Sequence, residues 1–348
     1  MNLEEVWREC SYLKDLLEQP EAVARTIAGL EEQDALTAFA KGLRDGRWRR
    51  VVLTGMGSSY WACHPLYLRL LGAGLTPVLV ETSELIHFES DWLRPDTLVV
   101  AVSQSGRSVE TVRLLEMARG TADVVGITNT ADSPLARLSA AALLTRAGEE
   151  TTVACKTYAA TFIALEWLGD LVCGGTTAEL QTQTGPALDA MRGYLGQWPA
   201  HVNELLRTLD GVQDVFVVGR GTALAAAGMG GLILKESTHY HAEGMSAAAF
   251  RHGPFEMLSG AVFVAILEGD DRSSALSWKL AGDVREAGGR AAVVSPEAEG
   301  AFRIPASGAR VRPLVEILPI EMLTLALAAA KGREPGRFER ITKVTGVE

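Results

Sequence analysis

One stretch of the sequence, residues 232–254, gathers more proton-transferring side chains than any other. It reads LILKESTHYHAEGMSAAAFRHGP, and its candidates are Lys235, Glu236, His239, Tyr240, His241, Glu243, Arg251 and His252. Glu236 is set among leucine and tyrosine, and partial desolvation disfavours the charged form of a carboxylate, which tunes it towards general-base catalysis near neutral pH. If the helix continues to residue 243, helical spacing places five residues on one of its faces: Leu232, Glu236, His239, Tyr240 and Glu243. The alternative is a surface carboxylate beside Lys235, with histidines that only cap and pack.

Two loops rich in glycine and serine have the composition of an anion site: residues 54–59 (TGMGSS) and 103–108 (SQSGRS). Each joins an apolar run to a helical pattern, and the free N–H groups and dipole of a helix N-terminus favour negative charge. Neither loop is a P-loop, and TGMGSS lacks the third glycine of the dinucleotide fingerprint. Serine and glycine are also ordinary N-caps, but two such loops in one sheet favour a small phosphorylated ligand. The hydroxyls that would surround its phosphate, with Arg107 as the nearby cation, are those of Ser58, Ser59, Ser103, Ser105 and Ser108.

Short apolar runs alternate with helical patterns along most of the chain, which predicts doubly wound α/β domains with parallel sheets. The first block has predicted strands at 50–53, 77–80, 97–102, 123–127 and 142–145, with helices at 60–71, 109–118 and 159–171. Ligands of such sheets bind beyond the carboxyl ends of the strands, and both serine loops lie there.

A second block repeats the first in outline, with strands at 214–219, 261–267 and 290–295 and helices at 185–207, 223–236 and 274–287. Its loop 268–271 (EGDD) takes the place of SQSG, and its carboxylates would repel phosphate. We infer an internal duplication in which the first copy keeps the phosphate-binding loops and the second supplies Glu236. The predicted organisation is an N-terminal helical collar at 1–46, domains at 47–175 and 190–330, and a C-terminal tail at 331–348. The collar is predicted to hold helices over 4–30, broken at Gln19-Pro20, and over 34–44.

The composition is that of a globular protein, since 47% of the 348 residues are hydrophobic and 22% are charged. A formal net charge of −10 without a basic patch argues against nucleic-acid binding. No apolar run reaches the length expected of a membrane span, and the start MNLEE lacks the basic residues of a signal peptide. Cys10, Cys63, Cys155 and Cys173 show no CxxC spacing and are expected to be reduced thiols. We therefore expect a cytoplasmic protein with no membrane or nucleic-acid partner.

Taken together, these features resemble the tandem sugar-isomerase (SIS) domain family. Similar proteins include the isomerase half of glucosamine-6-phosphate synthase and the short phosphosugar isomerases, deaminases and deglycases. The resemblance runs from residue 18 to residue 348 and rests on six motifs in combination. They are 57–59 (GSS), 103–106 (SQSG), 234–236 (LKE), 241–243 (HAE), 252–254 (HGP) and 343–348 (KVTGVE).

The resemblance implies a homodimer that binds a sugar or amino-sugar 6-phosphate without a metal or cofactor. Its phosphate would be held by Ser58, Ser59, Ser103, Gln104, Ser105 and Ser108. Glu236 would be the base that moves a proton between C1 and C2, through an enediol or enolamine. His252 would assist ring opening from the neighbouring subunit, and Lys343 would close over the bound sugar.

The sequence also departs from the synthase, and the departures favour a branch that isomerises, deaminates or deglycates its substrate. The synthase's glutaminase domain is not seen, so we expect no glutamine-dependent amidotransfer. Ile233 stands in place of a lysine, Ala249 in place of a glutamate, and residues 152–156 read TVACK instead of VASTK. Isomerisation with deamination, as in a glucosamine-6-phosphate deaminase, is the leading prediction, with a fructosamine-6-phosphate deglycase as the alternative.

Three other interpretations are disfavoured. A non-catalytic phosphosugar sensor is disfavoured because no helix-turn-helix or basic region precedes residue 50 and all three catalytic candidates persist. A metalloenzyme would use His239, His241 and Glu243, since His-x-His is a plausible ligand pair, but enediol chemistry needs no metal. A nucleophilic cysteine has Cys155 as its one candidate, with no evident base partner.

Overall fold

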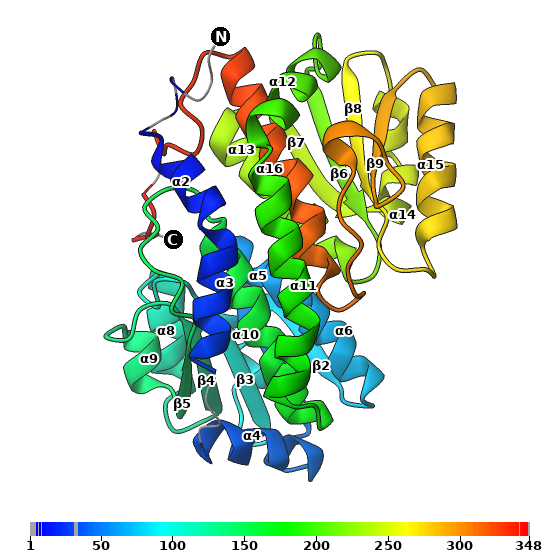
Figure 1. The fold of residues 1–348 in the computed structure, drawn as a ribbon. Coiled ribbons are helices and arrows are strands. Elements are labelled where there is room, and N and C mark those ends of the chain that lie inside the picture. The colour runs from blue at the N-terminus through cyan, green and yellow to red at the C-terminus, as the bar shows by residue number, and fades with distance from the viewer. Residues whose placement is uncertain (1–4, 6, 8, 31–33, 341, 347–348) are drawn as a thin grey trace. The chain divides into compact units, whose positions relative to one another are not determined.

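The computed structural model describes residues 5, 7, 9–30, 34–340 and 342–346, and Figure 1 shows the fold. The chain divides into two compact units, each built around one parallel β-sheet. The prediction of an α/β protein with two parallel sheets is confirmed. The N-sheet unit comprises Glu21–Glu150, Ala154–Thr182 and Arg340–Glu348, and the C-sheet unit comprises Met1–Pro20, Thr151–Val153 and Gln183–Glu339.

Five parallel strands form the N-sheet in the order β2-β1-β3-β4-β5. Their bounds are β1 Arg50–Gly55, β2 Pro77–Glu81, β3 Thr97–Val102, β4 Asp123–Thr128 and β5 Ala141–Leu144. β3 is buried at every position, as expected for a β-branched run in a sheet covered on both faces. Gly55 at the end of β1 pairs with Val102 at the end of β3. The two serine-rich loops therefore leave the same edge of the sheet from neighbouring strands.

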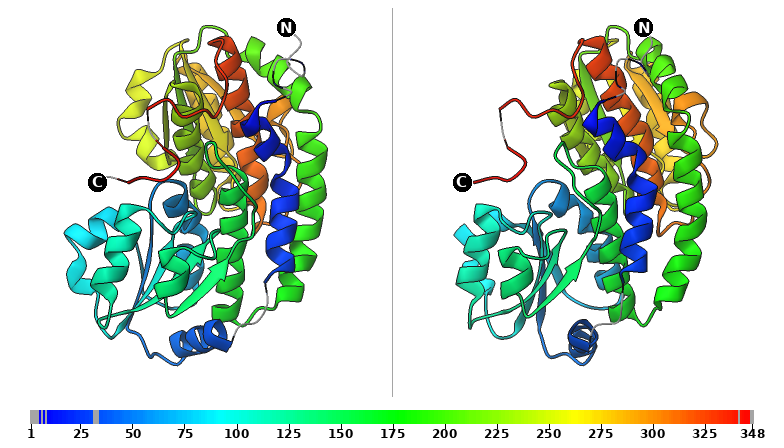
Figure 2. Two further views of the ribbon diagram at one scale, coloured as in Figure 1. Left: turned by 90° about the vertical axis from the view of Figure 1, so that its left-hand side faces the viewer. Right: turned by 60° about the vertical axis from the view of Figure 1, so that its left-hand side comes forward.

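The helices of this unit are α4 Asp34–Arg44, α5 Ser58–Ala62, α6 His64–Gly72, α7 Thr82–His87, the 3-10 turn η1 Ser90–Trp92, α8 Val109–Ala118, α9 Pro134–Leu138 and α10 Lys156–Cys173. They cover both faces of the N-sheet (Figure 2). Val52 and Val99 pack with residues of α7 and α8. Leu98 and Val100 face α4, α6 and α10 on the other side. This division follows from the alternation of side chains along a strand.

Four parallel strands form the C-sheet in the order β7-β6-β8-β9. Their bounds are β6 Asp214–Gly219, β7 His241–Ser246, β8 Val262–Leu267 and β9 Arg290–Val294. The helices of this unit are α2 Ser11–Leu17, α12 Trp198–Thr208, α13 Ala223–Thr238, α14 Ala247–Arg251, the turn η2 Pro254–Met257, α15 Ser274–Glu286, the turn η3 Gly300–Phe302 and α16 Arg312–Ala330. The division between the units falls within α3 Gln19–Ala28 and α11 Thr177–Leu195.

Small residues allow α13 to lie directly on β7. A Cβ added to Gly231 of α13 would be 2.0 Å from the backbone N of Gly244 in β7. A Cβ added to Gly244 would in turn be 2.1 Å from the carbonyl oxygen of Ala227. Glycine is required at both positions because the two backbones touch. This contact fixes the helix that carries Glu236.

The helix α16 forms the core of the C-sheet unit and packs against α12 and α13. By length and composition it could cross a membrane, contrary to the sequence expectation, but 89% of the relevant window is buried inside the protein. A helix that is hydrophobic all round and buried in this way is typical of a protein core. Two carboxylates, Glu316 and Glu321, are nevertheless fully buried in it.

The helix predicted over 223–236 does not continue to residue 243, so the condition for one helical face through Glu243 is not met. α13 ends at Thr238, His239 adopts a left-handed conformation with φ of 54°, and β7 begins at His241. The predicted helices 60–71 and 185–207 are each divided in two, by the break at Cys63 and by the break before Trp198. In both cases a proline stands in the first turn of the new helix, where its missing N–H costs no hydrogen bond.

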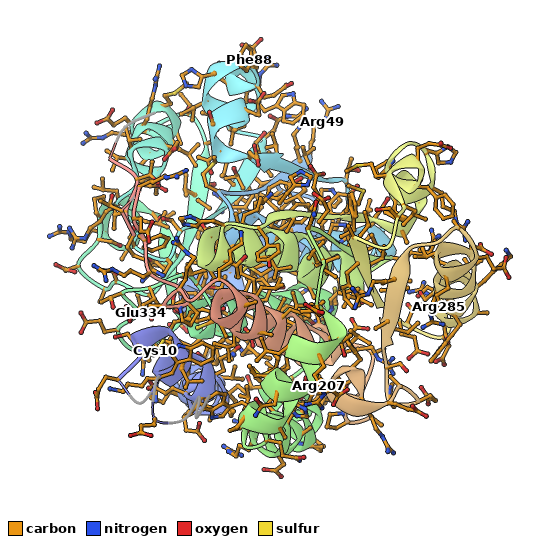
Figure 3. The ribbon with its side chains drawn as sticks, turned by 90° about the horizontal axis from the view of Figure 1, so that it is seen from above. Cys10, Arg49, Phe88, Arg207, Arg285 and Glu334 are labelled. Carbon is orange, nitrogen blue, oxygen red and sulfur yellow. The ribbon has the colours of Figure 1, made fainter. Side chains whose placement is uncertain are left out.

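The start of the C-terminal tail is anchored within the C-sheet unit. Lys331 Nζ donates to the carbonyl of His239 at 3.1 Å, and Arg333 Nη2 donates to His239 Nε2 at 3.2 Å. Further along the tail, Glu334 lies near Cys10 (Figure 3). Burial, together with this carboxylate, raises the pKa of Cys10. The tail is therefore tied to the end of α13 before it reaches Lys343.

Candidate active site

The first serine-rich loop turns at Gly57, which has a φ of 53°, and α5 begins at the next residue. Ser58 and Ser59 therefore occupy the first turn of this helix. A Cβ on Gly55 would lie 3.0 Å from the backbone of Ser59, so the strand end and the serine pair are closely packed. Positive φ at Gly57 and close packing at Gly55 explain the glycines of TGMGSS.

The second serine-rich loop is stabilised by its own hydroxyls. Ser103 Oγ accepts the backbone N–H of Gly106 at 3.2 Å, and Ser105 Oγ accepts the N–H of Arg107 at 3.2 Å. Beyond them, the hydroxyl of Ser108 lies 2.7 Å from that of a threonine in the first turn of α8. These bonds hold the loop against the N-terminus of α8, where backbone N–H groups favour an anion.

Gly106 and Arg107 fix the outer side of this loop. Gly106 has a φ of 60°, and a Cβ there would lie 2.3 Å from the hydroxyl oxygen of Ser133. Arg107 pairs with Asp132 at 2.8 Å, and its side chain is 41% exposed. The cation that the sequence places nearest to the loop is thus engaged by a surface carboxylate.

A small, closely packed pocket joins the two loops to the first turns of α10. It is lined by Ser58, Ser59, Gln104, Thr157, Tyr158 and Thr161. Ser103, Ser105 and Ser108 belong to the same loop as Gln104 but do not line the pocket. Every lining residue is uncharged, and five of the six carry a hydroxyl.

Sequence reasoning missed Thr157 and Thr161, although a signal existed. They stand four residues apart, so they share one face of α10. Both are buried, with 2% and 5% exposure. The start of α10 was also predicted three residues too late, at 159 instead of Lys156.

A buried carboxylate that the sequence did not single out, Glu150, caps α10. Its Oε1 accepts the backbone N–H groups of Cys155 at 2.9 Å and Thr157 at 3.2 Å. The thiol of Cys155 donates to the same oxygen at 3.5 Å. A carboxylate at this place stabilises the helix because it satisfies free N–H groups and complements the dipole. Cys155 is fully buried and takes part in this cap, which is a structural role.

Lys343, the tail residue expected to close over the sugar, pairs with Glu150. The distance from Lys343 Nζ to Glu150 Oε2 is 2.6 Å, and the two side chains are 20% and 0% exposed. Two residues further on, the carbonyl of Thr345 accepts the N–H of Val109 at 3.2 Å. The tail thus runs from the cap of α10 to the N-terminus of α8, within the N-sheet unit.

The other two catalytic candidates lie in the C-sheet unit. Glu236 is partly exposed in the last turn of α13. His252 is exposed and follows α14, with its N–H donating to the carbonyl of Ala249 at 2.9 Å. Strand β7 separates the two residues along the chain.

The structure assigns His239 and His241 to different partners. His239 Nε2 accepts from Arg333, whereas His241 Nδ1 lies 2.8 Å from Asp214 and its Nε2 lies 3.8 Å from Glu243. Within the described ranges, no group of three or more histidine, cysteine, aspartate or glutamate side chains is arranged to hold a metal ion. The proposed ligand pair of the metalloenzyme interpretation therefore does not converge.

The loop after β8 differs from its counterpart after β3. Glu268 pairs with Arg312 at 3.1 Å, and the N–H of Gly269 donates to Glu316 Oε1 at 2.8 Å. Burial raises the pKa of Glu316 to about 7. Carboxylates and an arginine of the chain itself occupy this edge of the C-sheet, where the N-sheet has its serine loop.

Comparison with known proteins gives a family for the N-sheet. Residues 46–169 match the model of the SIS domain. The isomerizing glutamine–fructose-6-phosphate aminotransferase of Pyrobaculum aerophilum is 30% identical over an alignment of 348 positions, which covers 97% of this chain and 57% of that protein. The chain thus spans little more than half the length of this curated relative.

Two solved structures share the fold. One is the C-terminal domain of glucosamine-fructose-6-phosphate aminotransferase from Francisella tularensis, with a TM-score of 0.78, 21% identity, and 95% of this chain and 98% of that chain covered. The other is glucosamine-6-phosphate deaminase from Thermotoga maritima, with a TM-score of 0.74, 18% identity, and 97% and 100% covered.

Proposed function

Because this chain belongs to the SIS domain family, we propose that it is an enzyme that binds a sugar or amino-sugar 6-phosphate and transfers a proton between C1 and C2. The observation that carries the proposal is the uncharged, hydroxyl-lined pocket at the carboxyl edge of the N-sheet, with the Lys343 amine held at the cap of α10. Ligands of doubly wound sheets bind at such edges, next to the point where the strand order reverses.

A phosphate monoester suits this pocket. Hydroxyl and amide groups can donate to all of its oxygens, and the N-terminus of α8 stabilises its negative charge. The proposed phosphate ligands are Ser58, Ser59, Ser103, Gln104, Ser105 and Ser108, and the pocket adds Thr157 and Thr161. Binding of the phosphate would supply the free energy that orients C1 and C2 for reaction.

The proposed chemistry is a proton transfer without a change in oxidation state overall. Glu236 removes the proton from C2 of the open-chain aldose, the electron pair forms the C1–C2 double bond, and the C1 carbonyl opens as its oxygen takes up a proton, which gives an enediol. Return of a proton to C1, with loss of the proton from the C2 hydroxyl, gives the ketose. His252 assists ring opening by exchanging a proton with the ring oxygen, and Lys343 closes over the sugar.

An amine on C2 leads to deamination by the same steps. Proton transfer from C2 to C1 through an enolamine leaves an imine at C2, and water hydrolyses it to a ketone and ammonia. Glucosamine 6-phosphate would thus give fructose 6-phosphate. A glucosamine-6-phosphate deaminase and an aminotransferase domain both share this fold, so the fold admits the deaminating branch without selecting it. What favours this branch is Ile233, which is fully buried in the core at the position where the resemblance implies a lysine in the synthase.

The direct test is an end-point assay of the purified protein with glucosamine 6-phosphate, in which fructose 6-phosphate and ammonia are measured together. Formation of both products establishes a deaminating isomerase. With neither product, fructosamine 6-phosphates come next, since a deglycase releases its amine from C1. Thermal stabilisation by several phosphosugars with turnover of none would contradict the enzymatic proposal and favour a sensor.

The phosphate assignment has its own test. Ser103→Ala and Ser105→Ala are expected to weaken binding of the sugar phosphate, because each hydroxyl also orders the loop. Isothermal titration with glucose 6-phosphate measures this directly. Unchanged affinity in both variants would contradict the assignment.

We propose further that the two sheets are tandem copies of one domain, with the N-terminal helices as a collar, in a cytoplasmic homodimer. The exposure of His252 suits a residue that completes the site of a neighbouring subunit. Mixed dimers of Glu236→Gln and His252→Ala chains are expected to recover part of the activity. No recovery in confirmed mixed dimers would contradict a shared site.

A further inference from the structure

Glu150 connects three segments of the N-sheet unit through one buried carboxylate. It precedes α10, caps the first turn of that helix, and pairs with the C-terminal tail. Capping uses mainly Oε1, which accepts the backbone N–H groups of Cys155 and Thr157. Oε2 has different partners, the hydroxyl of Thr157 and the amine of Lys343. Helix capping alone therefore does not account for this side chain.

Lys343 neutralises a charge that is costly to bury. The Glu150 side chain is 0% exposed. Among the residues that the structure describes, it forms an ion pair with Lys343. Removing one partner of a buried pair leaves an uncompensated charge, which strongly favours the paired arrangement. The tail is thereby held at a defined point of the N-sheet unit.

The shared oxygen places this pair at the wall of the pocket. Thr157 lines the pocket, and its hydroxyl binds the same Oε2 atom as Lys343 Nζ. One carboxylate oxygen thus separates the amine of the tail from a pocket-lining side chain. The bond from Val109 N to the carbonyl of Thr345 fixes the tail a second time, immediately after the SQSGRS loop.

We propose that Glu150 is a positioning residue whose charge holds the Lys343 amine beside the pocket, in the orientation that the reacting carbons of the substrate require. It acts through Lys343 and does not itself touch the substrate. The inference rests on the proposed function, because it gives the amine a role in turnover. It names a residue that neither the serine loops nor the Glu236 stretch contains.

The first experiment needs no substrate. The rate at which acetic anhydride modifies Lys343 is measured by mass spectrometry in the wild-type protein, in Glu150→Gln, and in Glu149→Gln as the matched control. Glu149 is the exposed neighbour in the sequence. Modification is expected to rise severalfold in Glu150→Gln and to stay unchanged in Glu149→Gln. An equal rate in all three proteins would overturn the proposal.

The second experiment is a double-mutant cycle on turnover of the 6-phosphate sugar that the enzyme accepts. Glu150→Gln keeps an acceptor oxygen for the helix cap and is expected to lower kcat about tenfold or more, since a small misplacement has effects of this size. Affinity for the sugar phosphate is expected to change little. In a Lys343→Gln background the same substitution is expected to cause no further loss, because its effect passes through the lysine. If the losses of kcat from Glu150→Gln and Lys343→Gln add up in the double variant, the proposal is overturned, and Glu150 then serves only as the cap of α10.

A second variant covers the case in which Glu150→Gln does not fold. Glu150→Asp keeps the charge and shortens the side chain by one methylene, so intermediate effects on kcat and on Lys343 modification are expected. A fall in kcat with unchanged Lys343 modification would contradict the proposal. If no 6-phosphate sugar is turned over, the proposed function fails, whereas the modification result still decides whether Glu150 holds the amine.

Discussion

Gly231 of α13 and Gly244 of β7 meet backbone to backbone, with no room for a Cβ on either residue. β7 is an edge strand of the C-sheet, and its partner β6 lies on one side only. The close approach of the helix therefore sets the position of α13, and with it the position of Glu236 near the helix end.

Gly231→Ala tests this contact. The added methyl group would lie 2.0 Å from a backbone nitrogen, so the helix must shift. Overpacking of this kind typically lowers the free energy of unfolding by about 1–3 kcal/mol. Gly282→Ala in α15 is the control, because no atom lies within 4 Å of its added Cβ. It is expected to stabilise the protein by about 0.5–1 kcal/mol. Urea denaturation of both variants measures the difference, and equal stabilities would contradict the contact.

A glycine in the second serine loop gives a prediction about binding. Gly106→Ala combines a positive φ with a Cβ 2.3 Å from the Ser133 hydroxyl. We expect it to displace the loop and to weaken binding of glucose 6-phosphate. Gly120 has a φ of 75° and open space around it, so Gly120→Ala carries the strain without the clash. A left-handed conformation costs a residue other than glycine about 1–2 kcal/mol, so both variants should lose stability. Calorimetric titration should separate them, and equal loss of affinity in both would contradict a specific role for Gly106.

Much of the fold was predictable because local signals and tertiary structure agree. The strand 97–102 and the helices 34–44 and 109–118 have the predicted bounds. β7 was missed because HAEGMS is short and polar and contains a glycine, and its strand conformation depends on pairing with β6. The periodicity of apolar residues alone could not distinguish β7 from the end of the preceding helix.

The candidate site likewise contains residues that local sequence signals predict and residues that they do not. Ser58, Ser59 and Gln104 come from motifs next to strand ends, and the structure brings them to one pocket. Glu150 carries no local signal, because its partner Lys343 lies 193 residues away in the sequence. Contacts of this kind become visible only when the chain has folded.

The buried carboxylate of Glu316 gives a prediction about pH. Burial raises its pKa from 4.5 to about 7, so the folded state holds this proton more tightly than the unfolded state does. Well below pH 4.5 both states are protonated, so this group adds no pH dependence to the stability. Between pH 4.5 and pH 7 the unfolded state loses the proton first, so this group lowers the stability as the pH rises. One pKa unit corresponds to 1.36 kcal/mol, so the full effect is about 3 kcal/mol.

Glu316→Gln removes this dependence and keeps an acceptor for the N–H of Gly269. The difference in unfolding free energy between the variant and the wild-type protein is therefore expected to shift in favour of the variant from pH 5 to pH 7.5. Urea denaturation across this range measures the shift, with Glu286→Gln, on the exposed end of α15, as the control. A difference that does not change with pH would show that Glu316 does not titrate in this range.

Glu236→Gln is the substitution that bears most directly on the proposed chemistry. The amide has nearly the shape of the carboxylate but cannot accept the C2 proton, so turnover should fall by about 10²–10⁴-fold, the usual contribution of a general base. Binding of glucose 6-phosphate should be retained, because the proposed phosphate ligands lie in the N-sheet unit. Glu243→Gln, on the exposed side of β7, is the control and should keep near wild-type activity. Steady-state kinetics and calorimetric titration of both variants give kcat and affinity separately. A Glu236→Gln enzyme with near wild-type kcat would show that another residue is the base, whereas loss of binding would show that the substitution disturbs the fold of the site.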